Sequence, residues 1–271
     1  MKRTFSVLFF CLLLSLSANA FSFNLSIDVP KVKLKVKAGE IIRGSLTVRN
    51  PSEDEIKVKV YAEDFSYIAP YNGAKKFFPP GSTEFSLAHW ITFSPQEIIL
   101  PAFGKKKVNY AIKVPAEVSG GYYAVLFFET SLGAITSPEE GANILILGRV
   151  GSLFFLEAED SLKKAKIEKI ATEGNTVKGD FLNRGNLIII SKGSFYVMDD
   201  QGMIFDRGKI NDIYISPGDK APFSLTLADD ISPGSYTLIT SFDLEEGDLL
   251  VREIDFSKDA TGELKILQVR E

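Results

Sequence analysis

Residues 89–129 read HWITFSPQEIILPAFGKKKVNYAIKVPAEVSGGYYAVLFFE, and this segment decides the fold class of the chain. Apolar and polar residues alternate from Lys107 to Val114, which is the period of a half-buried strand. Pro115 lacks the N–H that a strand ladder needs, and Gly120-Gly121 supply a turn. The apolar, aromatic run 122–128 has strand length and suits the middle of a sheet. The segment therefore predicts β-strands joined by short turns.

The rest of the chain follows the same pattern. Alternating runs occur at residues 21–29, 32–36, 42–49 and 56–60, and a long apolar run spans 143–157. Beyond Lys163, short strand-length runs are separated at regular intervals by turn residues such as Ser216-Pro217-Gly218. No heptad or strong helical pattern lies between them. We therefore predict an all-β chain with two immunoglobulin-like β-sandwich domains, over residues 21–160 and 161–271.

The first twenty residues predict a secretory signal peptide. Lys2 and Arg3 precede a compact apolar run over 5–16, and Ala18-Asn19-Ala20 is a small-residue cleavage site. The apolar run is too short to cross about 30 Å of hydrocarbon comfortably, and no later run approaches that length. We therefore expect cleavage of residues 1–20, no membrane span afterwards, and an exported protein in the periplasm or at the cell surface.

The single cysteine, Cys11, lies inside this signal. The mature chain is therefore expected to have no disulfide, no thiolate nucleophile and no cysteine metal site. Removing Lys2 and Arg3 leaves 29 of the 31 basic residues against 35 acidic ones, a formal charge of −6. A surface of that sign argues against nucleic acid as a partner, because phosphate binding needs a basic surface.

Catalytic chemistry has little support in the residue pattern. His89 is the only histidine, and no G-x-S-x-G nucleophile motif is present. A zinc site without cysteine would need several histidines, and the acidic clusters lack the spacing of a calcium loop. A glycosidase carboxylate pair stays open by count, although nothing singles out two partners. We predict a non-enzyme with no catalytic residues, no metal and no cofactor.

Several segments resemble known families of exported β-sandwich proteins. These are LTVRNPSEDEIKVKVYAEDF (46–65), the segment 90–128, FLNRGNLIIISKGSFYVMDDQG (181–202), ISPGDKAPFSL (215–225) and SPGSYTL (232–238). The first two resemble the immunoglobulin-like first domain, sometimes called peptidoglycan-binding-like, of bacterial surface proteins associated with WxL proteins. The other three resemble the second sandwich that follows in such proteins. More distantly, the chain is similar to periplasmic pilus-assembly chaperones. The resemblance implies two sandwiches and a protein partner from the cell envelope, such as a pilus-like subunit.

The chaperone resemblance also implies an Arg–Lys pair that holds the partner's C-terminal carboxylate between the domains. Residues 146–156 contain Arg149 and Ser152 but no lysine, and the first strand carries lysines and no arginine. Those lysines, Lys31, Lys33, Lys35 and Lys37, share one face of a strand. They could form a patch for an anionic surface polymer, or they could protect an edge strand from aggregation.

The strand 143–157 is the predicted partner-binding element. If one of its sides is unpaired, it could add a partner strand through main-chain hydrogen bonds. The predicted contacts are Leu145, Leu147, Leu153 and Phe155 for apolar groups and Arg149 for a carboxylate. Two alternatives stay open, because the strand could be fully paired within the first sandwich or be covered by Phe21–Val29.

Tyr67 and Tyr71 lie in a long aromatic connection beside turn residues. They could grip a partner, stack on sugar rings or simply fill the core. The sequence thus predicts a non-enzymatic exported binding protein that assembles or chaperones envelope or surface protein subunits. The alternative is a module that binds peptidoglycan or another surface glycan.

Overall fold

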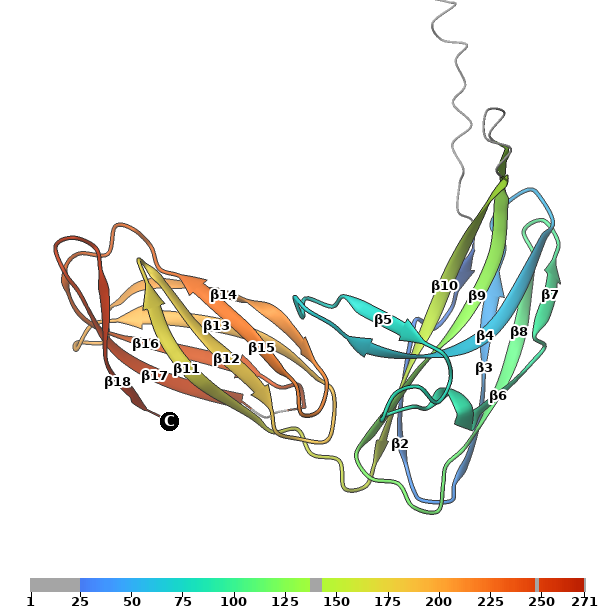
Figure 1. The fold of residues 1–271 in the computed structure, drawn as a ribbon, viewed down its shortest axis with the longest axis horizontal. Coiled ribbons are helices and arrows are strands. Elements are labelled where there is room, and N and C mark those ends of the chain that lie inside the picture. Colours follow the sequence, from blue (N-terminus) through green and yellow to red (C-terminus); the bar gives the residue numbers. More distant parts are fainter. Residues whose placement is uncertain (1–24, 137–142, 247–248, 271) are drawn as a thin grey trace, which may run out of the picture.

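The computed structural model describes residues 25–136, 143–246 and 249–270, so the predicted signal peptide lies outside the described residues. The fold is two β-sandwiches set at an open angle to each other (Figure 1). The one helical element among the described residues is a short 3₁₀ turn, η1 (Ala88–Trp90). The prediction of an all-β chain with two immunoglobulin-like sandwiches is confirmed.

The first sandwich packs a four-stranded sheet against a six-stranded sheet. In order, the smaller sheet contains β1 (Ser26–Ile27), β3 (Ile41–Arg49), β8 (Lys105–Lys113) and β6 (Ile91–Ser94). The larger sheet runs β2 (Lys31–Val36), β10 (Asn143–Ala158), β9 (Gly121–Thr136) and β4 (Ile56–Tyr67), and both β5 (Lys75–Phe78) and β7 (Glu97–Leu100) pair with β4.

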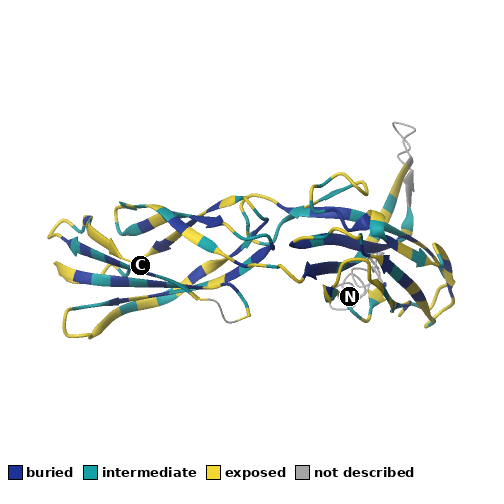
Figure 2. Cartoon of the chain, turned by 90° about the horizontal axis from the view of Figure 1, so that it is seen from below, coloured by how far each residue is buried: buried dark blue, intermediate teal, exposed yellow. Residues whose placement is uncertain are grey.

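The apolar residues that alternate along the segment 89–129 fill the core of this sandwich. Val108 and Ile112 of β8 face Leu126 and Phe128 of β9, and all four are fully buried. Trp90 packs against this core but stays partly exposed. The alternation of buried and exposed positions along the strands is visible in Figure 2. The alternation of apolar and polar residues therefore determines which side chains of β8 and β9 face the core.

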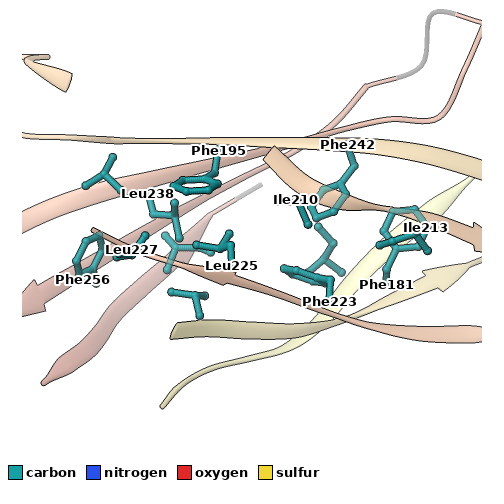
Figure 3. Packing of buried hydrophobic residues seen from close by; sticks show 14 of the residues in the cluster. Phe181, Phe195, Ile210, Ile213, Phe223, Leu225, Leu227, Leu238, Phe242 and Phe256 are labelled. Atoms are coloured by element: carbon teal, nitrogen blue, oxygen red, sulfur yellow. The ribbon is translucent and has the colours of Figure 1, made fainter. Parts of the chain in front are cut away.

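The second sandwich also has two sheets. The three-stranded sheet runs β11 (Ala165–Glu173), β12 (Thr176–Asn183) and β15 (Lys220–Thr226). The five-stranded sheet runs β14 (Ile204–Ile215), β13 (Ile189–Met198), β16 (Gly234–Asp243), β17 (Leu249–Lys258) and β18 (Leu264–Arg270). In its core the ring of Phe242 lies 5.4 Å from Phe181 and 5.1 Å from Phe223 (Figure 3).

Each sandwich contains a buried asparagine in the turn after one of its early strands. The Asn50 Nδ2 donates to the carbonyl oxygens of Asp54, at 2.7 Å, and Pro101, at 3.0 Å. The Asn183 Nδ2 donates to those of Leu187, at 2.7 Å, and Ile215, at 3.3 Å. Both side chains satisfy backbone groups that the turn leaves unpaired. The two sandwiches thus share the same arrangement of a buried asparagine at the end of a strand.

Candidate functional site

The two sides of β10 are paired to different extents. One side pairs with β9 along the whole strand, from Asn143 to Glu157. The other side pairs with β2 in parallel, and only from Leu153 to Ala158. The Leu153 N–H donates to the Pro30 carbonyl at 2.9 Å, which marks the start of that pairing. Within the described residues, β10 therefore has no second paired strand over residues 143–152. We call this side of β10 the open edge.

The main-chain groups on the open edge can be assigned from Leu153. Because its N–H points toward β2, the N–H and C=O groups of every second residue before it point the same way. Leu145, Leu147, Arg149 and Gly151 therefore direct their backbone groups away from β9. The one irregularity in the β9 pairing, between Ile146 and Leu147, places the extra residue on β9 and leaves the alternation of β10 intact. The open edge is thus a regular row of donors and acceptors.

The side chains along the open edge are apolar on both faces of the sheet. Leu145 and Leu147 are 60% and 52% exposed, and Ile144 on the opposite face is 56% exposed. Ile146 and Val150, on the same face as Ile144, are partly exposed. Exposed, unpaired apolar strands promote aggregation, and proteins normally protect them with charges, bulges or covering segments. Arg149 is the one charged residue among residues 143–152.

Two of the predicted partner contacts lie in the paired half of β10. Phe155 is 5% exposed, and Leu153 packs beside it. Both belong to an apolar group between the sandwiches, which we call the junction cluster. Its buried members are Phe65, Tyr67, Tyr123, Val125, Phe127, Phe155 and Ile188. Leu153 and Phe155 thus lie in the junction cluster, whereas Leu145 and Leu147 lie on the open edge. All four side chains nevertheless share one face of one strand.

The two predicted tyrosines also lie between the sandwiches. Tyr67 is 3% exposed within the junction cluster, and burial raises its pKa. Tyr71 is partly buried against the core of the second sandwich. The structure therefore brings Tyr67 together with Phe155, through Phe65, and leaves both tyrosines away from the open edge.

Arg149 lies on the open edge, but its guanidinium already has partners. It lies over the Phe127 ring at 4.0 Å and donates to the Tyr61 hydroxyl at 3.2 Å and to Glu63 at 3.4 Å. The Tyr61 hydroxyl in turn donates to Glu129 at 2.7 Å. The pKa of Arg149 is raised despite its burial, through the Tyr61 hydroxyl and the nearby carboxylates. This arrangement holds the side chain flat against the sheet and partly neutralises its charge.

A different cation lies where the open edge ends. Lys31 begins β2, opposite Leu153, and its Nζ lies 4.5 Å from the centre of the Phe155 ring. Burial lowers the pKa of Lys31, and the neighbouring Lys33 lowers it further. No direct ion pair to Lys31 is found in the part of the chain that the structure describes. The alternating lysines of the sequence predict that Lys31 lies on one face of a strand. They do not indicate that this face ends at the junction between the two sandwiches.

Beside Lys31, ion pairs connect the two sandwiches. Glu245 of the second sandwich accepts from Lys33 at 3.1 Å and from Lys163 at 3.4 Å. Glu157 and Lys163, both largely buried, line a cleft of about 640 Å³ together with Glu245. The cleft is also lined by Lys35, Lys37, Glu40, Glu159 and Glu246, so with Lys31 and Lys33 the lysines and carboxylates here are equal in number.

His89 has a structural partner. Its Nδ1 lies 2.9 Å from the Ser86 Oγ, which donates to the fully buried Asp64 at 2.6 Å. Asp64 also accepts from the Ser82 and Thr83 N–H groups, so it anchors the connection before β6 to β4. In a nucleophilic triad the histidine links serine and acid, and here the serine lies between the other two. No group of three metal-ligating side chains occurs among the described residues.

We compared the chain with known proteins. No family model matches the chain, and no curated protein matches it. Among solved structures, the class 5 fimbriae chaperone CfaA has a TM-score of 0.50 at 16% identity, covering 90% of this chain and 100% of that one. A chain from a chaperone–tip adhesin complex of CFA/I fimbriae has a TM-score of 0.49 at 16% identity, covering 84% and 97%.

A chain from the CsuC–CsuE pre-assembly complex of Acinetobacter baumannii has a TM-score of 0.46 at 10% identity, covering 84% and 98%. At these identities, the likeness to CfaA shows a shared two-sandwich fold and nothing finer. Of the two predicted resemblances, the distant one to fimbrial chaperones thus has a structural counterpart, and the one to WxL-associated proteins stays a prediction. In the described part of the chain, no helix has the length and apolar character needed to cross a membrane.

Proposed function

We propose that this protein is a non-enzymatic, exported, chaperone-like binding protein that holds a pilus-like subunit of the cell envelope by strand addition. The observation that carries this proposal is the open edge, where β10 has no second paired strand among the described residues and Ile144, Leu145 and Leu147 are each more than half exposed. Strand addition supplies main-chain hydrogen bonds from Leu145, Leu147 and Arg149, and apolar side chains on both faces supply contact area. The fold shared with CfaA, a chaperone of fimbriae, supports the same class.

The geometry at the end of the open edge favours one direction for the added strand. Since β2 continues the same edge and runs parallel to β10, a partner strand parallel to β10 would end against Pro30. Its C-terminal carboxylate would then lie beside Lys31. We therefore propose that the partner presents its C-terminal strand, and that Lys31 rather than Arg149 receives the carboxylate. A partly buried lysine without a direct ion pair gains more from such a contact than an arginine already held by Glu63.

The glycan-binding alternative rests on aromatic rings that could stack on sugars. Tyr67 is buried in the junction cluster, and Tyr71 is partly buried against the second sandwich, where it lines a cleft of about 950 Å³. No observation among the described residues favours that alternative over strand addition.

A crosslinking experiment tests the proposal in the cell that exports the protein. A photoreactive phenylalanine replaces Leu145, and the products are compared in Leu147→Pro and Leu147→Val backgrounds. Proline removes an N–H that points to the open edge and is not needed for pairing with β9, whereas valine keeps it. We expect a crosslink to an exported protein with Leu147→Val and its loss with Leu147→Pro.

Equal crosslinking in both backgrounds, or crosslinks to glycan alone, would contradict the proposal. A photoreactive residue at Leu267 of β18, which is 56% exposed in the second sandwich, controls for nonspecific capture. If Leu147→Pro does not fold, Leu147→Lys replaces it, because a lysine on an edge strand blocks pairing and leaves the sandwich intact.

A further inference from the structure

The hairpin formed by β4 and β5 leaves the first sandwich and reaches the second (Figure 1). At its tip, the carbonyl of Tyr71 accepts a hydrogen bond from the Tyr214 N–H of β14 at 2.8 Å. The side chain of Tyr71 packs against the core of the second sandwich. A residue of one domain thus completes the packing of the other.

The backbone at the tip shows that this contact is specific. Tyr71 has a φ of 62°, a left-handed conformation that an aromatic residue adopts rarely. Gly73 has a φ of 100°, and a Cβ there would meet the Tyr214 ring at 3.5 Å. Unfavourable conformations persist where the surroundings stabilise them. Here the surroundings of the hairpin tip are the second sandwich.

The hairpin is supported from behind by a continuous row of rings. The Tyr67 ring lies 5.1 Å from Tyr214 across the domain boundary, and the ring of Phe65 lies 5.9 Å from Tyr67. Phe155 of β10 follows at 5.7 Å from Phe65. The row therefore connects the paired half of β10 with β14 of the second sandwich.

A second contact lies closer to the covalent link between the sandwiches. The Ile188 N–H donates to the Tyr123 hydroxyl at 2.6 Å, and the Gly121 N–H donates to the Asn186 carbonyl at 2.9 Å. The Lys33–Glu245 ion pair, at 3.1 Å, is a third contact between the sandwiches. The hairpin tip attaches at Tyr214, on a different strand and farther along the chain, so it opposes rotation from a separate position.

We propose that the β4–β5 hairpin is a strut that fixes the angle between the two sandwiches, with Tyr71 as the residue that engages the second one. The strut acts on the isolated protein and does not depend on any partner. Tyr71 is then a positioning residue, and the aromatic connection has an intramolecular role.

Distance measurements between two spin labels test the strut. The mature chain is expected to have no cysteine, so Lys106→Cys on β8 and Lys265→Cys on β18, both exposed, place one label on each sandwich. The test variant is Tyr71→Gly, which removes the ring and suits a positive φ. The matched control is Lys76→Ala, an exposed position on the same hairpin.

We expect a narrow distance distribution in the parent and in Lys76→Ala, and a distribution at least twofold broader in Tyr71→Gly. Hydrogen exchange in the same variant checks that β13 and β16 keep their protection, so that broadening reports domain motion and not unfolding. An unchanged distribution in Tyr71→Gly would overturn the strut. If Tyr71→Gly unfolds the second sandwich, Tyr214→Ala removes the facing ring, and an unchanged distribution there would overturn it as well.

Discussion

The two halves of β10 have similar compositions and opposite surroundings. Residues 153–158 are paired on both sides, and Phe154 and Leu156 are fully buried. Residues 143–152 are paired on one side, and Ile144, Leu145 and Leu147 are each more than half exposed. Residues 143–152 contain two leucines and two isoleucines, and residues 153–158 contain two leucines and two phenylalanines. Apolar composition therefore does not decide which half forms core and which half stays open.

The neighbouring N-terminal segment decides it. β1 pairs with β3 in the smaller sheet, and β2 pairs with β10 in the larger one, so the chain crosses between sheets at residues 28–30. The Ser152 Oγ donates to the Val29 carbonyl at 2.7 Å at this crossing. Pro30, which follows, lacks an N–H and cannot extend the ladder along β10. The place of the crossing thus sets how much of β10 stays open.

The largest difference between the halves should appear in stability. Phe154→Ala removes a fully buried ring that packs at 5.0 Å against Tyr110, and we expect it to lower the free energy of unfolding by about 3–5 kcal/mol. Ile144→Ala shortens a side chain that is 56% exposed, and we expect less than about 1 kcal/mol. Chemical denaturation of the mature protein measures both.

Partner capture should follow the opposite order. If the open edge binds a partner, Ile144→Ala reduces crosslinking from Leu145, whereas Phe154→Ala leaves it intact in the fraction that is folded. A cost above about 2 kcal/mol for Ile144→Ala would show that the open half contributes to the core of the isolated protein, and the contrast between the halves would then fail.

The position of the N-terminal segment also explains why the sequence alone did not distinguish the two halves of β10. The apolar period identified β10 as a strand, because that period follows from local geometry. The period could not show where the pairing of β10 with β2 begins. That point depends on the crossing at Pro30, which lies more than a hundred residues away in the sequence. For the same reason, Leu145 and Phe155 looked equivalent as partner contacts although the structure separates them.

The aromatic connection illustrates a second limit. Tyr67 and Tyr71 sit beside turn residues, which is the pattern of a surface loop. Their burial depends on a second sandwich whose position no local pattern specifies. The same limit applies to the lysines of β2. The alternation predicts that Lys31 and Lys33 share a strand face, but it does not predict that Lys31 lies over Phe155 or that Lys33 pairs with Glu245. Residues at a domain junction are thus the ones that a single sequence predicts least well.

Hydrogen exchange should show a smaller contrast, within the main chain alone. The N–H of Leu153 is bonded to Pro30, whereas those of Leu145 and Leu147 point to the open edge. We expect exchange at Leu145 and Leu147 to be at least about tenfold faster than at Leu153 in the isolated protein. Mass spectrometry or NMR at residue resolution measures this ratio. Equal, slow exchange along all of 143–157 would mean that the edge is covered, and the strand-addition proposal would have to be dropped.

The smallest expected effect concerns Lys31, at the boundary between the two halves. Burial lowers its pKa below the ordinary 10.5, so the fold disfavours its charged form. A lowered lysine pKa makes the folded state less stable below that pKa, and stability is regained as the pH rises through it toward 10.5. Lys31→Met removes the penalty at neutral pH and keeps an apolar contact with Phe155. We expect the variant to match the parent within about 1 kcal/mol at pH 7, because solvent screens this partly exposed side chain.

The sign is the informative part of that prediction. Any gain in stability of Lys31→Met over the parent should shrink between pH 7 and pH 10.5, as the parent lysine loses its proton. Thermal denaturation across this pH range measures the trend. A loss of stability at pH 7 that shrinks when the carboxylates of Glu245 and Glu157 are protonated at acid pH would show that these groups stabilise Lys31 in the isolated protein. Lys31 would then already be paired, as Arg149 is, and a partner carboxylate would have to be received elsewhere along the junction.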